Sequence, residues 1–358
     1  MSVDLDDSTR KTNGLRLRGA LGWVWTVLGP FLGLLFIAGL FAWLTRDSGS
    51  FLTAYNWRTI AVQTVIVGTA ALGMTCIMIA GGIDLSVGSA VALVTVVMAL
   101  LVRDYHVPVL LALGIGIVVG GGCGLLNGGL ISGLGVVPFI ITLGTLKVFR
   151  GVAKWLSDST PAYIPREAKG TWFREVMAVD RPAPNWTSSL SGSPGEIIRE
   201  LTRLAPGVWL LLVLSLLVAA MLRSSLLGRH AFAIGSNEAT ARLCGIRVGR
   251  VKLAVYGLAG LLTGLAGVLQ FLYLDGTGDP TTADGLELQV IAAVVIGGGS
   301  LSGGEGTVLG TLIGCLIMSV LNNGCVHAGI PNASQDVIIG AIIVAAVALD
   351  RFRRRLAD

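Results

Sequence analysis

The chain has 358 residues, of which 53% are hydrophobic and only 13% are charged, and its mean hydropathy is +0.79. Soluble domains carry about 25% charged residues, so this composition excludes an ordinary soluble domain. It predicts an all-α polytopic membrane protein, because each helix satisfies its own backbone hydrogen bonds inside the bilayer. The net charge of +5 does not indicate nucleic-acid binding, since the basic residues lie at the ends of apolar runs.

Motifs for chemistry are absent from the sequence. It contains no phosphate-binding pattern G-x-x-x-x-G-K-S/T, no nucleophile elbow and no Cys-x-x-Cys pair. The five cysteines lack paired spacing and the three histidines are scattered, which argues against a metal site. We therefore expect no catalytic residues and no cofactor bound by this chain.

The first half of the chain begins with a polar segment, residues 1–20, which predicts a cytoplasmic tail. The fifth of the apolar runs that follow carries Lys147, Arg150 and Lys154 roughly on one helical face. This predicts a short or re-entrant segment, or cations that reach an interface. The fourth run is rich in glycine, which predicts close helix packing. The five runs cover residues 21–44, 59–80, 90–102, 108–131 and 138 onward.

The second half contains two long polar segments of different charge. Residues 158–205 carry six Lys/Arg and six Asp/Glu, whereas residues 223–252 carry six Lys/Arg and a single acid, Glu238. Five further apolar runs cover residues 206–222, 253–274, 288–296, 307–325 and 337–349, and a basic tail closes the chain at 351–358.

The distribution of Lys and Arg predicts the orientation. Basic segments stay on the cytoplasmic side, so the N-terminal tail, the 223–252 loop and the C-terminal tail should all be cytoplasmic. Ten spans join them and place the charge-balanced 158–205 loop outside. We expect one transmembrane domain over residues 21–350, with both termini on the cytoplasmic side of the inner (cytoplasmic) membrane.

Two glycine-rich breaks interrupt the apolar runs. The first break (residues 81–89, GGIDLSVGS) and the second break (residues 297–306) match at five of eight positions when 81–88 is aligned with 297–304. Two interpretations stay open: an internal repeat, as in many transporter folds, or chance similarity between glycine-rich turns. The candidates for a broken helix or a solute pathway are Gly81, Gly82, Asp84, Ser86, Gly88, Gly297, Gly298, Ser302 and Gly304.

Asp84 is the clearest acid inside the apolar sequence. A charge at mid-bilayer costs about 2.5–3.5 kcal/mol on insertion scales, so its surroundings must hold it. We predict that Asp84 is the N-cap of the following helix. The alternative is a polar group that lines the solute pathway or binds an ion. Asn127 and Asn322 are further candidates for a solute path, because few polar residues lie on the apolar runs.

Residues 235–246 predict a short helix inside the basic loop. Asn237 is a suitable N-cap, Glu238 suits the first turn, and Gly245 suits the position after the last turn. The helix is either a plain surface helix or a docking element for a cytoplasmic partner. The candidate coupling residues are Gly235, Asn237, Glu238, Ala239, Ala241 and Gly245.

Four ordered motifs resemble the permease subunits of bacterial monosaccharide ABC importers of the ribose/xylose/arabinose/galactose type. They are GGIDLSVGS at residues 81–89, PFIITLGT at 138–145 followed by FRG at 149–151, the glycine-bounded segment 228–246, and IAAVVIGGGSLSGG at 291–304. The similarity covers roughly residues 50–350. The 158–205 loop is longer and more charged than expected for the family, and Lys147 and Lys154 are unusual.

The resemblance implies a fold similar to vitamin B12-type importers, with about ten helices in each subunit. It also implies a homodimer, two copies of a cytoplasmic P-loop ATPase that bind ATP and magnesium, and an external sugar-binding protein. Residues 235–246 would then sit in a cleft of the ATPase. The predicted function is inward movement of a monosaccharide. The alternatives are an ABC permease for another small solute, such as branched-chain amino acids, and a secondary ion-coupled carrier that uses Asp84.

Overall fold

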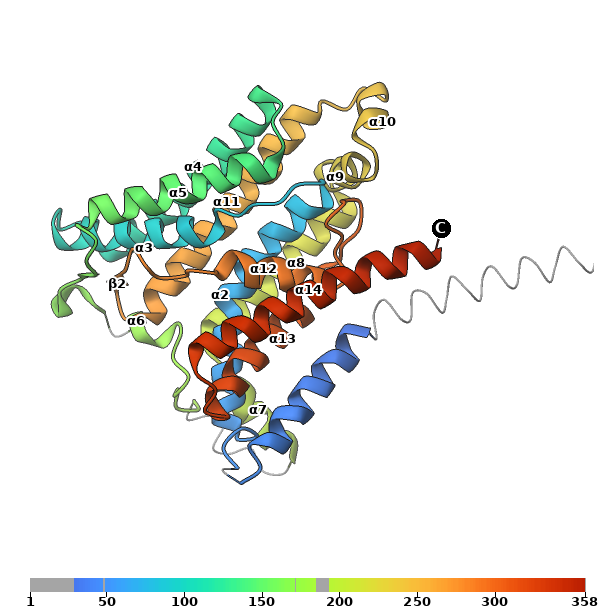
Figure 1. Ribbon diagram of the computed structural model, residues 1–358. Helices are drawn as coiled ribbons and strands as arrows, with labels where there is room; N and C mark the ends of the chain where they lie inside the picture. Colours follow the sequence, from blue (N-terminus) through green and yellow to red (C-terminus); the bar gives the residue numbers. More distant parts are fainter. Residues whose placement is uncertain (1–28, 48, 171, 185–192, 358) are drawn as a thin grey trace, which may run out of the picture.

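The computed structural model describes residues 29–47, 49–170, 172–184 and 193–357. Regular structure in this part of the chain is nearly all helical, as expected (Figure 1). The predicted tail 1–20 and the start of the first predicted span lie outside the described residues. The elements before the long polar loop are a helix over Gly29–Leu44, α2 (Ala54–Ile79), α3 (Val87–Arg103), α4 (Val109–Leu134) and α5 (Pro138–Leu156).

The long polar loop contains β1 (Ala162–Tyr163), a 3-10 turn (Arg166–Ala168), α6 (Trp172–Glu175) and α7 (Ser193–Thr202). The remaining elements are α8 (Pro206–Ser224), α9 (Leu226–Ser236), α10 (Glu238–Leu243), α11 (Val248–Tyr273), β2 (Thr277–Gly278), α12 (Leu286–Ile296), α13 (Val308–His327) and α14 (Asn332–Ala357).

Each predicted apolar run coincides with a helix. Five of the described helices are long and apolar enough to cross a membrane: α2, α4, α8, α11 and α13. This makes the chain a multi-pass helical membrane protein. The polar tail predicted at the C-terminus is a continuation of α14, which runs on to Ala357. Helix α9 was not predicted as a separate element.

Glycines bring α4 and α11 into close contact. A Cβ added at Gly260 would lie 2.5 Å from the Gly120 carbonyl oxygen, and one added at Gly264 would lie 2.7 Å from the Ile117 carbonyl oxygen. Only residues without side chains permit this distance between backbones. The prediction of close packing by the glycine-rich run is therefore confirmed.

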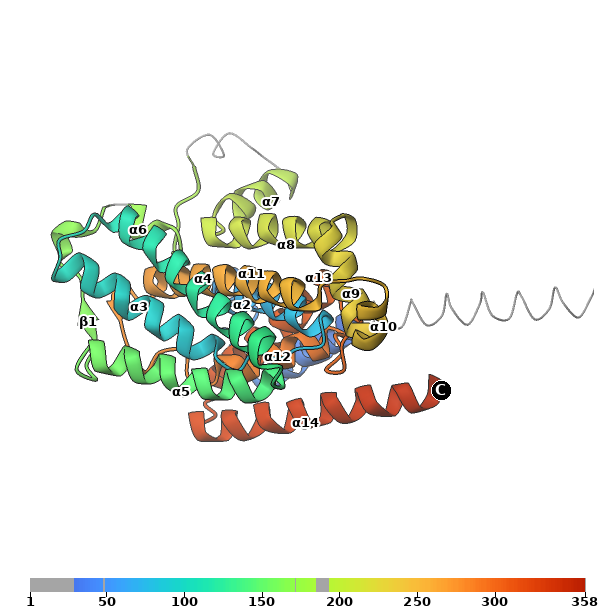
Figure 2. The same ribbon diagram turned by 90° about the horizontal axis from the view of Figure 1, so that it is seen from above.

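The connections gather at two ends of the bundle. The α2–α3 and α12–α13 links lie beside α9 and α10 at one end, and α6 and β2 lie at the other end of α11 (Figure 1). Figure 2 shows α14 along one side of the bundle, where it contacts α12. We call the first end the coupling end and the second the loop end.

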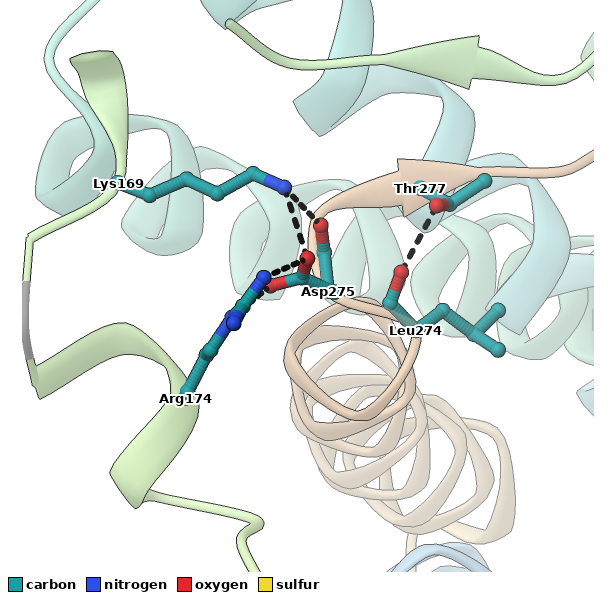
Figure 3. Close-up of polar contacts among 5 residues, drawn as sticks. All are labelled: Lys169, Arg174, Leu274, Asp275 and Thr277. Carbon is teal, nitrogen blue, oxygen red and sulfur yellow. Dashed lines mark hydrogen bonds and ion pairs between the residues drawn. The ribbon is translucent and has the colours of Figure 1, made fainter. Parts of the chain in front are cut away.

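The first part of the long polar loop folds onto the α11–α12 link at the loop end. Strand β1 pairs antiparallel with β2, with Ala162 opposite Gly278. Asp275 accepts hydrogen bonds from Lys169 Nζ at 3.1 Å and Arg174 Nη2 at 2.9 Å (Figure 3). Hydrogen bonding from Arg174 is the main cause that lowers the pKa of the Asp275 carboxyl, and Lys169 adds to it against the opposing effect of burial. This described first part of the loop is therefore folded against the α11–α12 link. We call it the cover.

Candidate coupling junction and solute path

Two short helices, α9 and α10, form a corner with well-capped ends. The Ser225 side chain accepts a hydrogen bond from the Gly228 N–H at 3.0 Å, and the Asn237 side chain accepts one from the Thr240 N–H at 2.9 Å. These bonds satisfy amide groups that have no partner within the helix. The prediction that Asn237 caps a short helix is confirmed. We call residues 225–246 the coupling corner.

The end of α10 is a Schellman motif. Gly245 N–H donates to the Arg242 carbonyl at 3.0 Å, and Ile246 N–H donates to the Ala241 carbonyl at 3.1 Å. Gly245 has a φ of +82°, which glycine adopts without strain. The predicted position of Gly245 just after the helix is confirmed.

Glu238 fastens α10 to α11. Its carboxylate accepts hydrogen bonds from Lys252 Nζ at 2.7 Å and Arg242 Nη2 at 2.6 Å. Burial acts to raise the pKa of the Glu238 carboxyl, but the hydrogen bonds and charges of Lys252 and Arg242 outweigh it and lower that pKa overall. Glu238 therefore helps to set the position of α10 on α11.

The predicted coupling residues divide into two groups. Ala241 is buried and Gly235 packs inward, whereas Asn237, Ala239 and Gly245 are exposed. The sequence reasoning missed Leu243, whose side chain is 89% exposed at the end of α10. The 223–252 segment contains other apolar residues, such as Leu226, Phe232 and Ile246, so nothing in the sequence singled Leu243 out.

The two glycine breaks meet at Gly235. A Cβ added at Gly303 would lie 2.8 Å from both the Gly81 Cα and the Gly235 carbonyl oxygen, and one added at Gly235 would overlap the Ile79 carbonyl oxygen. The three backbones are thus packed without any side chain between them. The last residues of α9 connect directly to α10, so the coupling corner touches both breaks.

The breaks also share a turn at the aligned positions. Ser86 N–H donates to Asp84 Oδ1 at 2.8 Å, and Ser302 N–H donates to Ser300 Oγ at 3.0 Å. Each break has a glycine with positive φ just after the preceding helix, Gly81 after α2 and Gly298 after α12. These two glycines are one position apart in the alignment. The shared turn agrees with the repeat interpretation, and the offset means that the two breaks are not identical in backbone path.

The remaining break glycines serve close packing. Gly82 lies against the Tyr256 hydroxyl, which would be 2.5 Å from an added Cβ, and Gly88 lies against Glu287 at the start of α12. Gly297 packs on the Gly310 backbone, and Gly304, with a φ of +76°, lies next to Ser236. The first break therefore carries the chain from the coupling end into the interior, where α3 and α12 both begin.

The prediction that Asp84 is the N-cap of α3 is wrong. The cap residue is Ser86, because residues 85 and 86 form a turn before the helix starts at Val87. Asp84 Oδ1 accepts bonds from the Ser86 N–H and, at 2.6 Å, from the Ser86 hydroxyl. Asn127 Nδ2 donates to Asp84 Oδ2 at 3.4 Å and to Ser86 Oγ at 2.8 Å. Asp84 thus shapes the turn that precedes α3 and ties it to α4.

The two asparagines predicted for a solute path lie far apart. Asn127 is buried beside Asp84 and lines only a void of about 10 Å³. Asn322 lines a cavity of about 600 Å³, formed where α2, α11, α12 and α13 approach the loop end. We call this second space the solute cavity.

Comparisons with known proteins find a matching family and several relatives. A family described as the branched-chain amino acid transport system / permease component matches residues 56–347. The ribose import permease protein RbsC of Bacillus subtilis (strain 168) is 38% identical over 90% of this chain and 92% of its own length.

Two further relatives have similar coverage. The D-allose transport system permease protein AlsC of Escherichia coli (strain K12) is 34% identical over 91% of this chain and 92% of its own. The L-arabinose ABC transporter permease protein AraH of Azospirillum brasilense is 32% identical over 94% of this chain and 91% of its own length. No solved structure matches the chain.

The relatives are permease proteins that match this chain along nearly their whole length, and the family covers most of the chain. The chain is accordingly a transport subunit and not an enzyme. It belongs to the family of branched-chain amino acid transport system permease components.

Proposed function

We propose that this chain is the transmembrane permease subunit of an ABC importer that carries a monosaccharide of the ribose type across the inner membrane. The names of the relatives, which are ribose, D-allose and L-arabinose permeases, support the solute class. The sequence contains no P-loop motif, and in this proposal ATP and magnesium are bound by separate P-loop ATPase subunits.

One observation carries the mechanism: the coupling corner is in backbone contact with both glycine breaks. An ATPase that pushes on α10 moves α9, and Gly235 passes that movement to the end of α2 and to the α12–α13 link. Interfaces packed this closely move as rigid bodies and do not deform continuously. The breaks let α3 and α12 shift while the long helices keep their own hydrogen bonds.

The finer features are part of the same proposal. The subunit acts as a homodimer with about ten spans in each copy, in a fold similar to the vitamin B12-type importers. The coupling end faces the cytoplasm, because it carries the basic 223–252 loop, and both termini lie on that side. The loop end faces outward and receives the external sugar-binding protein.

Leu243 provides the sharpest test of docking, because its exposed side chain contributes little to the folding stability of the chain itself. The Leu243→Asp variant is expected to fold and insert normally but to lose ATP-driven uptake by at least tenfold, since it places a charge in an apolar contact. The Leu243→Met variant keeps an apolar side chain of similar volume and should retain uptake.

The measurement is copurification of the ATPase with the permease, together with sugar uptake into reconstituted vesicles. Normal copurification and uptake by the Leu243→Asp variant would contradict docking through α10. The replacements Glu238→Arg and Gly245→Arg are less suitable, because the first breaks the contacts with Lys252 and Arg242 and the second strains a positive φ.

A further inference from the structure

The solute cavity is lined mainly by uncharged polar side chains from helices that are distant in sequence. Its volume of about 600 Å³ lies within the usual range for small-molecule sites, about 300–1,000 Å³. Asn322 Nδ2 donates to Gln289 Oε1 at 3.4 Å, and Gln270 Nε2 donates to Thr282 Oγ1 at 3.0 Å. The amide side chains on its wall are Asn56, Gln63, Gln270, Gln289, Asn322, Asn323 and Gln335.

Three buried polar atoms on this wall have no hydrogen-bond partner within the described structure. They are Gln63 Oε1 on α2 and Ser319 Oγ and Asn323 Oδ1 on α13. Ser319 and Asn323 are only 3% and 6% exposed. Buried polar groups are nearly always paired, and each unpaired one is unfavourable. A group of three around one cavity therefore points to a ligand that supplies the missing partners.

The charge of the wall restricts which ligand fits. Among the described lining residues, Asp284 is the one acid, and there is no Lys or Arg. The Asp284 side chain is 89% exposed and lies 3.6 Å from Arg150 Nη2, so its charge is solvated and partnered. Both ring nitrogens of His327 are engaged, with Ser50 and Asn56.

The start of α12 does not offer a site for a carboxylate either. A helix N-terminus attracts anions, but Glu287 occupies the first turn of α12. A free amino acid would bring both an ammonium and a carboxylate group into a wall without a matching pair of charges. A neutral molecule with several hydroxyl groups would donate to the Gln63 and Asn323 oxygens and pair with the Ser319 hydroxyl.

We propose that the solute cavity is a binding site for a neutral polyhydroxylated solute, with Gln63, Ser319 and Asn323 as its main recognition residues. The inference rests on the proposed transport function and adds the location and chemistry of the site. It also separates the sugar from the amino-acid alternative, because the wall suits hydroxyl groups and not a zwitterion.

A thiol-protection experiment tests the site without relying on transport. Four of the five native cysteines are buried and Cys244 is exposed, so the full chain carrying Cys244→Ser and Asn322→Cys presents one reactive thiol, in the cavity. In nanodiscs, D-ribose at the highest tolerated concentration should slow the reaction of this thiol with a maleimide, and L-leucine should not. Equal protection by L-leucine would overturn the neutral-solute chemistry, and no protection by D-ribose would overturn the site.

A matched pair of serine variants provides the second measurement. Ser319→Ala should lower the rate of ATP-driven D-ribose uptake by roughly fivefold, through loss of one hydrogen bond to the solute. Ser215→Ala removes a buried hydroxyl on α8 that bonds the Leu211 carbonyl, away from the cavity, and should not change uptake. If the unmodified complex shows no ATP-driven uptake, the proposed function fails; if it transports and Ser319→Ala transports equally well, the cavity assignment fails alone.

Discussion

The backbone N–H of Gly304 donates a hydrogen bond of 3.0 Å to the carbonyl oxygen of Ile79. This bond joins the second glycine break to the last turn of α2, and the two bonded residues are 225 positions apart in the sequence. Gly235 packs against both partners of the bond. A displacement of the coupling corner therefore acts on α2 and on the α12–α13 link together, which is the mechanical basis of the proposed mechanism.

Gly235→Ala should disrupt this junction. The new methyl group overlaps the Ile79 carbonyl oxygen and lies close to the Gly304 amide, so the backbones must separate. Overpacking of a tight contact costs about 1–3 kcal/mol. We expect a lower melting temperature in detergent and at least a tenfold loss of ATP-driven uptake.

Gly151→Ala is the matched control, because nothing lies within 4 Å of an added Cβ at that position on α5. It should leave both the melting temperature and uptake unchanged. If Gly235→Ala behaves like Gly151→Ala, the junction does not transmit the movement.

The contact between α4 and α11 should be equally sensitive to added volume. A Cβ at Gly124 would lie 2.7 Å from the Gly260 Cα, whereas one at Gly122 meets open space. Gly124→Val should reduce the yield of folded, monodisperse protein severalfold in size-exclusion chromatography. Gly122→Val should cause little loss, and equal losses from the two variants would contradict the observed packing.

The cover at the loop end should depend on the charge of Asp275. Arg174 and Lys169 lower the pKa of the Asp275 carboxyl, so the stabilisation by these ion pairs is fully present at neutral pH. It is lost as the pH falls below the ordinary aspartate pKa of about 3.9 and then through the lowered pKa of Asp275. Hydrogen exchange of residues 162–176 should stay slow down to that range. Asp275→Asn should speed this exchange at neutral pH, and unchanged exchange in the variant would show that β1 and β2 hold the cover alone.

Asp84→Asn tests the role of the acid in the first break. An asparagine oxygen can still accept the bonds from the Ser86 N–H and hydroxyl, so we expect the variant to fold and to retain ATP-driven uptake. Asp84→Leu removes the acceptor and should destabilise the turn before α3. A fully folded Asp84→Asn protein without uptake would instead give the carboxylate a direct role in the pathway.

Sequence reasoning predicted the elements whose signals are local. The caps at Asn237 and Gly245 are set by residues within one turn, and the glycine breaks are visible as interruptions of apolar runs. Helix α9 was missed because residues 223–252 were interpreted as a loop from their charge. Gly228 lets the start of α9 pack against Leu222, and Gly235 lets its end pack against Ile79.

The relationships between distant residues were not predictable in the same way. Asn127 was predicted for the solute path from its polarity within an apolar run, and its hydrogen bond to Asp84, 43 positions earlier, was not visible in the sequence. The solute cavity combines Gln63 with Asn323, on helices that are adjacent only after folding. Hydrophobic periodicity says which residues face inward but not which partners they meet, so the site had to come from the structure.

In the proposed mechanism, ATP hydrolysis by a partner ATPase drives uptake through this permease. The most direct measurement is labelled D-ribose uptake into vesicles that contain the permease and its ATPase, with the external binding protein added. We predict uptake that requires ATP, stops when the ATPase is omitted, and is unaffected by ionophores that collapse proton and sodium gradients. Uptake driven by an ion gradient in vesicles that lack the ATPase would contradict the account.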